Sequence, residues 1–164
     1  MPRALSKSFY VILLFILITA NICLYQEIFA PRVLKVMVLE IGKGDAILIR
    51  TSNKKTLLID TGPDAGILRA LGTSLPEWQK TINAIALTSS KTSSVGGLSE
   101  VLQKYRVQTI LHFGTDIPYG TSFALDSTRI TIIAPDTVTI SYGSTSLSIS
   151  STTPAGTFIS DGKK

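Results

Sequence analysis

The sequence contains its most informative motif at Leu39-Glu40-Ile41-Gly42-Lys43-Gly44-Asp45-Ala46-Ile47-Leu48-Ile49. Two apolar runs, Val33 to Leu39 and Ala46 to Thr51, stand on either side of its glycine turn. Short apolar runs joined by glycines are typical of strands and turns, so we predict an antiparallel pair of strands here. A third strand is expected from Thr56 to Ile59, and it leads into a second block, Leu57-Leu58-Ile59-Asp60-Thr61-Gly62.

Helical spacing begins after this second block. Apolar residues at Ile67, Leu68, Leu71 and Leu75 predict a helix over residues 65–75, with Asp64 as its N-cap. A second helix is expected around Leu98, Val101, Leu102 and Tyr105. Further strands are expected over residues 82–87, 107–111, 129–134, 137–142 and 146–150. Strands that alternate with helices predict a layered α/β domain, and residues 153–164 are expected to form a flexible tail.

The first thirty residues have a different composition. No charged side chain occurs from Ser8 to Gln26, and a helix of that length rises about 28 Å, close to the roughly 30 Å of a hydrocarbon core. We therefore expect a basic cytoplasmic N-terminus over residues 1–8 and a single transmembrane helix over 9–26, with the domain outside the cytoplasm. Its expected membrane-facing residues are Phe9, Leu13, Leu14, Ile16, Leu17 and Tyr25.

A cleaved signal peptide is the alternative for this segment, because both begin with basic residues and an apolar run. The apolar run is long and no A-x-A site follows it, which favours an anchor. Cys23 is the only cysteine in the sequence, so an intrachain disulfide is excluded.

The two blocks occur in a fixed order with the strand Ile85-Ala86-Leu87-Thr88 and the helix start Gly96-Gly97-Leu98. That frame resembles the metallo-β-lactamase-fold domain of ComEC-type DNA-uptake proteins, from about Pro31 to about Ser150. The family's first block reads L-D-V-G-Q-G-D-A/S-I-L-I, so Glu40 and Lys43 depart from it. The resemblance implies an αββα layered fold over residues 31–152, mainly its first half, because family members continue through a second αβ half.

The resemblance also places a metal centre. In the family, the slot between the last strand and the helix start reads H-x-D-x-D-H and supplies ligands to two zinc or manganese ions. Here the ligand positions are Ser89, Lys91, Ser93 and Ser94. Neutral hydroxyls bind zinc poorly, and Lys91 places an ammonium where a cation belongs. A later family ligand, the Asp of a T-G-D motif, has no counterpart either, so we expect no catalytic residue and no metal cofactor.

Other candidate residues have simpler interpretations. The resemblance implies that Asp45 and Asp60 support loops, and we expect the glycines to permit turns and close packing. The full set of expected fold-supporting residues is Gly42, Gly44, Asp45, Asp60, Gly62, Gly96 and Gly97. A nucleophilic pair of Ser89 or Ser90 with Lys91 is less favoured than a solvated polar loop, and His112 is expected to be a partly buried strand-end side chain rather than a lone base.

The charge distribution gives little support to nucleic-acid binding. From Pro31 onward the sequence has 14 lysine and arginine residues against 10 aspartate and glutamate residues, a net charge of +4. No basic run is denser than Lys54-Lys55 or Lys163-Lys164. This charge is compatible with weak, salt-sensitive contact to DNA or anionic lipid and demonstrates neither.

These observations favour a membrane-anchored, non-catalytic domain with a binding or accessory role. Its expected partners are the membrane and either another protein or a second copy of the chain. Two alternatives remain open: a metallo-hydrolase of the nuclease or phosphodiesterase class linked to DNA uptake, and a truncated fragment without a selected function.

Overall fold

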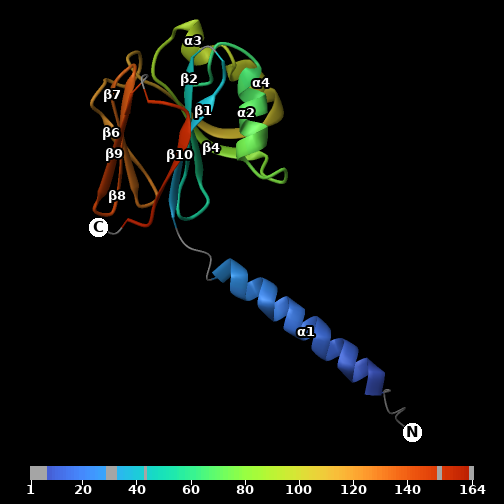
Figure 1. Ribbon diagram of the computed structural model, residues 1–164. Helices are drawn as coiled ribbons and strands as arrows, with labels where there is room; N and C mark the ends of the chain where they lie inside the picture. Colours follow the sequence, from blue (N-terminus) through green and yellow to red (C-terminus); the bar gives the residue numbers. More distant parts are fainter. Residues whose placement is uncertain (1–6, 29–32, 43, 151–152, 163–164) are drawn as a thin grey trace. The chain divides into compact units, whose positions relative to one another are not determined.

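The computed structural model describes residues 7–28, 33–42, 44–150 and 153–162 (Figure 1). The chain divides into two units, residues 1–31 and residues 32–164. The first unit contains one helix, α1 (Lys7–Ile28), whose side chains from residue 8 to residue 22 are all exposed.

The prediction of a transmembrane helix over residues 9–26 is not confirmed. Within the described part of the chain, no helix combines the length and the apolar character needed to cross a membrane. The side chain of Tyr25 lies outside the described residues.

The second unit is built on a six-stranded mixed sheet in the order β10-β1-β2-β3-β4-β5. The glycine turn joins β1 (Leu34–Glu40) to β2 (Asp45–Arg50) as an antiparallel pair, as predicted, and β3 (Thr56–Ile59) pairs antiparallel with β2. β4 (Thr81–Leu87) and β5 (Arg106–His112) continue the sheet in parallel. Both faces of this sheet are covered, which explains the unbroken apolar runs in its strands.

Three helices cover one face of the six-stranded sheet: α2 (Gly66–Ser74), α3 (Thr92–Val95) and α4 (Leu98–Lys104). Their apolar side chains form a core with one side of the strands, including Ile67, Leu71 and Val101. Asp64 does not cap α2 as predicted. The helix begins one residue later than expected, with Ala65 at the N-cap, and the Asp64 carboxylate instead accepts a hydrogen bond from the Gly66 N–H at 2.7 Å.

A second sheet packs on the other face. It is an antiparallel meander of β6 (Ser122–Leu125), β7 (Thr128–Ala134), β8 (Thr137–Tyr142) and β9 (Thr145–Ser150). Apolar side chains of both sheets fill the space between them, among them Val36, Ile49, Ile130 and Ile140. The unit therefore has three layers, helix, sheet and sheet, and the mixed α/β class is confirmed (Figure 1).

The fourth layer of the expected αββα arrangement is not present among the described residues. The outer face of the second sheet is polar over much of its width. A row of aligned hydroxyl residues, Ser122, Thr131, Thr139 and Ser148, crosses all four strands. Two pairs in this row hydrogen-bond, Ser122 with Thr131 at 2.8 Å and Thr139 with Ser148 at 3.0 Å. The same face also carries the exposed side chains of Arg129 and Ile133.

The structure corrects the prediction that residues 153–164 form a flexible tail. Residues 156–160 form β10 (Gly156–Ser160), which pairs antiparallel with β1 from Leu34 opposite Ser160 to Val38 opposite Gly156. The segment is rich in small polar residues, and its strand is specified by the available edge of β1 rather than by its own composition.

One polar cluster joins a turn of each sheet. The Thr51 hydroxyl donates to an Asp126 carboxylate oxygen at 2.8 Å, and the Lys55 ammonium lies 3.1 Å from the other oxygen. Burial raises the pKa of the Asp126 carboxyl, but hydrogen bonds from Thr51, Lys55 and Asn53 and the charge of Lys55 together lower it below its ordinary value of 3.8.

This cluster predicts an acid-sensitive contribution to stability. Because the pKa of Asp126 is lower in the folded chain, its contribution is present above pH 3.8 and is lost as the pH falls below that value. Asp126→Asn keeps a residue type that tolerates the positive φ of this position. We expect it to reduce the free energy of unfolding at pH 7 by about 1 kcal/mol and to flatten its decline near pH 4, measured by denaturant unfolding. The exposed Asp136→Asn is the control, and an equal loss there would contradict the role of the cluster.

Candidate functional site

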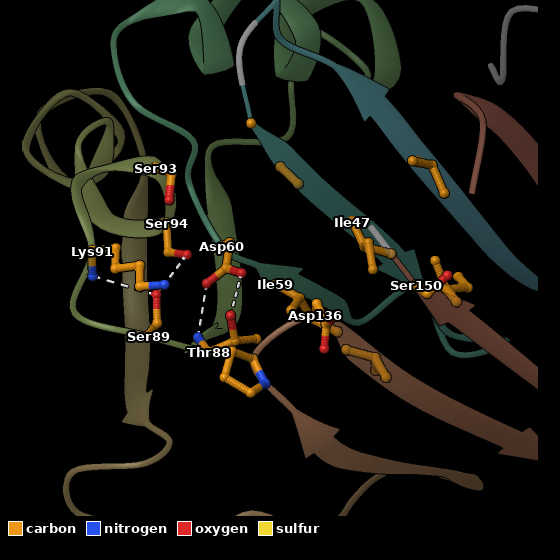
Figure 2. Close-up of a pocket in the computed structure, with 16 residues that line it drawn as sticks. Ile47, Ile59, Asp60, Thr88, Ser89, Lys91, Ser93, Ser94, Asp136 and Ser150 are labelled. Carbon is orange, nitrogen blue, oxygen red and sulfur yellow. Dashed lines mark hydrogen bonds between the residues drawn. The ribbon is translucent and has the colours of Figure 1, made fainter. Parts of the chain in front are cut away.

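A cavity of about 220 Å³ lies at one end of the space between the two sheets (Figure 2). One part of its wall is aliphatic, and the rest is polar. The aliphatic residues are Val38, Ile47, Ile59, Val138 and Ile149. The polar residues are Asp60, Thr88, Ser89, Lys91, Ser93, Ser94, Asp136 and Ser150.

Strand order brings the polar residues together. β3 and β4 are parallel neighbours, so the residues that follow them, Asp60 and Thr88, meet at the same edge of the sheet. The chain then turns through Ser89 into α3, which carries Ser93 and Ser94. All four positions that the sequence identified as the degenerate metal slot, Ser89, Lys91, Ser93 and Ser94, line this one cavity.

Asp60 ties the ends of β3 and β4. Its side chain is buried, and its carboxylate accepts from the Thr88 N–H at 2.8 Å and from the Thr88 hydroxyl at 2.6 Å. Its own N–H donates to the Ala86 carbonyl at 2.9 Å. Both carboxylate oxygens thus bind groups of the adjacent strand end, which fixes where the following loop begins.

The serines of the slot bind one another. The Ser89 hydroxyl donates to the Ser94 hydroxyl oxygen at 3.0 Å and accepts from the Lys91 N–H at 3.3 Å. The Ser94 carbonyl accepts from the Thr61 N–H at 2.8 Å and from the Thr61 hydroxyl at 3.0 Å. These bonds hold the slot loop as a closed polar unit on the cavity wall.

The donor set does not fit the two zinc or manganese ions that the family resemblance implies. Such a centre needs several imidazole and carboxylate ligands, and the slot supplies three hydroxyls and one ammonium. Among the described residues, no three His, Cys, Asp or Glu side chains are grouped closely enough to hold a metal ion. His112 does not line the cavity, and the side chain of Asp45 lies outside the described residues.

Two glycines allow α3 and α4 to approach the loop after β3. A Cβ on Gly96 would collide with the Pro63 carbonyl, and a Cβ on Gly97 would lie 2.5 Å from the Thr61 carbonyl oxygen. The Gly97 N–H also donates to the Gly62 carbonyl at 3.0 Å. The close approach places the slot loop over the cavity.

Sequence reasoning missed the contribution of the second sheet. Asp136 lies in the turn between β7 and β8, and Ser150 ends β9, yet both line the cavity. The Tyr119 hydroxyl, also unanticipated, donates to the Thr88 carbonyl at 2.7 Å. No local pattern marks these residues, because their position depends on how the two sheets pack.

No protein-family model matches the chain, and no curated protein matches it. Similar solved structures include a metallo-β-lactamase of Cronobacter sakazakii with a HARLDQ motif, at 14% identity and a TM-score of 0.48, covering 65% of this chain and 55% of that one. A mutant in the same motif is 12% identical, with a TM-score of 0.49, and the match covers 65% of this chain and 56% of that one. The chemotaxis sensor ODP, described as a peroxy diiron species, is 15% identical, with a TM-score of 0.38. The match covers 65% of this chain and 58% of that one. The chain thus spans little more than half of each structure, and at these values the likeness assigns no activity.

The glycine contacts predict a sharp position dependence for one substitution. Gly97→Ala should cost about 1–3 kcal/mol of unfolding free energy, because the added methyl group meets two backbone carbonyls. Gly72→Ala, in α2 with open space around it, is the matched control and should be neutral or stabilise by up to about 1 kcal/mol. Thermal unfolding of both variants measures the difference, and equal effects would show that the close approach does not exist.

Proposed function

We propose that this chain is a non-catalytic, membrane-associated relative of the ComEC-type metallo-β-lactamase-fold domains, with a binding or accessory role. One observation carries the proposal: the four slot positions converge on one cavity, but they bring three hydroxyls and an ammonium in place of metal ligands. The chain thus keeps the sequence motifs of the family around this cavity and lacks the family's metal ligands there.

The polar wall argues for binding rather than hydrolysis. A di-metal hydrolase uses its cations to lower the pKa of a bound water and to stabilise the leaving oxygen. The slot supplies no pair of cations, because its one positively charged group is the Lys91 ammonium. The cavity instead offers hydrogen-bonding groups, charges of both signs at Lys91 and Asp136, and an aliphatic wall. These features suit a small molecule with polar and apolar parts.

Membrane association is proposed from α1. Large apolar side chains are exposed on every side of this helix, for example Val11 at 66% and Phe15 at 69%. A continuous apolar surface of this kind needs an apolar environment, and lipid supplies one. The basic residues before the helix, Arg3 and Lys7, favour contact with the anionic lipid of a cell membrane.

The two alternatives gain no specific observation. A nuclease or phosphodiesterase linked to DNA uptake would need the metal ligands that the slot lacks, and the sequence has no dense basic run for a nucleic acid. No feature of the described residues specifically favours a fragment without function.

The first prediction from this proposal concerns metal content. The full chain in detergent micelles, equilibrated with zinc and manganese and then desalted, should retain far less than one metal ion per chain by mass spectrometry of the elements. The variant with Ser89→His, Lys91→Asp, Ser93→Asp and Ser94→His should retain more zinc than the wild type, because it places four family-type ligands around the cavity. Two ions per wild-type chain would overturn the proposal and favour the hydrolase.

The second prediction concerns α1. In vesicle flotation, the full chain should rise with the lipid, and the double variant Leu13→Asp, Leu17→Asp should not, because each carboxylate costs about 3 kcal/mol in an apolar phase. Leu102→Asp, at an exposed leucine of the second unit, is the matched control and should float like the wild type. Flotation of the double variant would rule out α1 as the attachment.

A further inference from the structure

One end of the six-stranded sheet gathers basic residues from distant parts of the sequence. β1, β3, β4 and β5 begin at this end, and β2 and β10 finish there, as their parallel and antiparallel pairings require. The described bases within two residues of these strand ends are Lys35, Arg50, Lys54, Lys55, Lys80, Lys104 and Arg106. They come from four separate stretches of chain, so no dense basic run marks them in the sequence. We call this end of the second unit the basic end.

Acidic residues are distributed in the opposite way. The end of the unit that carries the slot loop includes the acids Glu40, Asp60, Asp64, Asp116 and Asp136. Lys91 is the base of the slot loop at that end. The basic end has fewer acids, Glu77, Asp126 and Asp161, and Asp126 is paired with Lys55 at 3.1 Å. The second unit therefore has a positive end and a negative end.

Several bases of the basic end repel one another. Lys35 and Arg50 lie directly opposite each other on β1 and β2, and like charges in that position destabilise a pair of strands. Lys80 and Arg106 are both exposed and adjacent, because the Arg106 N–H donates to the Lys80 carbonyl at 2.8 Å. None of these four side chains forms an ion pair with another described residue. An anionic surface outside the unit would relieve their repulsion.

Two large apolar side chains are exposed at the same end. Trp78, between α2 and β4, is 72% exposed, and Ile159, opposite Lys35 on β10, is 65% exposed. Tryptophan is enriched at the headgroup level of membranes, and exposed apolar side chains among bases suit a lipid surface. The chain that comes from α1 also enters the unit at this end, at Val33 and Leu34. A nucleic acid would use the charges and leave Ile159 without a role.

We propose that the basic end is a second membrane-binding surface, whose bases contact the headgroups of anionic phospholipids and whose Trp78 inserts at headgroup level. This inference rests on the proposed membrane association, because α1 is what holds the unit near lipid. Each base near an anionic surface strengthens binding about fivefold, and salt weakens the effect. With the basic end on the lipid, the cavity and the acidic residues around it face the aqueous phase.

Tryptophan fluorescence tests the surface directly, because Trp78 is the only tryptophan in the sequence. The full chain is bound to vesicles of brominated phosphatidylcholine, with or without phosphatidylglycerol, and flotation establishes attachment to each. Bromine quenches tryptophan on contact. We expect quenching of Trp78 to be about twofold stronger in the anionic vesicles, and this difference to disappear at high salt.

Two exposed arginines provide matched variants. Arg106→Glu, at the basic end, should abolish the stronger quenching in anionic vesicles, whereas Arg69→Glu, in α2, should keep it. Thermal unfolding of both variants confirms that they are folded. Equal quenching of the attached wild-type chain in the two kinds of vesicle, or equal effects of the two variants, would overturn the basic end as a lipid surface and leave attachment by α1 intact.

Two further outcomes would also contradict the inference. A chain that floats with neither kind of vesicle would overturn both the basic end and attachment by α1. A single-stranded oligonucleotide replaces the vesicles in a parallel titration. A change in Trp78 emission with the oligonucleotide, and none with anionic lipid, would assign the surface to a nucleic acid instead.

Discussion

The position of the cavity depends on the tie between Asp60 and Thr88. Parallel strands bring their carboxyl ends to one edge, but they do not fix the loops that follow. The Asp60 carboxylate does so by binding both the N–H and the hydroxyl of Thr88, at 2.8 and 2.6 Å. The next residue, Thr61, binds the Ser94 carbonyl and so fixes the far end of the slot loop. One turn after β3 therefore sets both ends of the polar wall.

These hydrogen bonds explain how a cavity wall made largely of hydroxyl groups keeps a fixed conformation. Carboxylates and imidazoles gathered at one point need a cation to offset their mutual repulsion and desolvation. Serines need none, because each hydroxyl both donates and accepts, as Ser89 does between Ser94 and Lys91. The close approach of Gly97 to the Thr61 carbonyl then holds the helix start against the loop. Hydrogen bonds and close packing thus stabilise the conformation of this loop.

Local signals in the sequence predicted the parts of the fold that depend on near neighbours. The glycine turn gave the β1–β2 pair, and the spacing of Ile67 and Leu71 gave α2. The strand β10 and the role of Asp136 in the cavity wall were missed for one shared reason. β10 pairs with a strand more than a hundred residues earlier in the chain, and Asp136 meets cavity residues some fifty residues earlier. Segments rich in Ser, Thr and Gly also carry little strand preference of their own. The four slot positions line one cavity because they lie in one short stretch of chain between β4 and the end of α3.

The outer face of the second sheet and the β5 edge of the six-stranded sheet expose different polar groups. The outer face of the second sheet presents the row Ser122, Thr131, Thr139 and Ser148, in which Ser122 bonds to Thr131 and Thr139 bonds to Ser148. β5 is different, because its unpaired groups belong to the backbone and no side-chain choice can satisfy them. Water can bind such backbone groups at an exposed edge. The face of the second sheet thus meets solvent largely with side-chain hydroxyls, and the edge of the six-stranded sheet meets it with backbone groups.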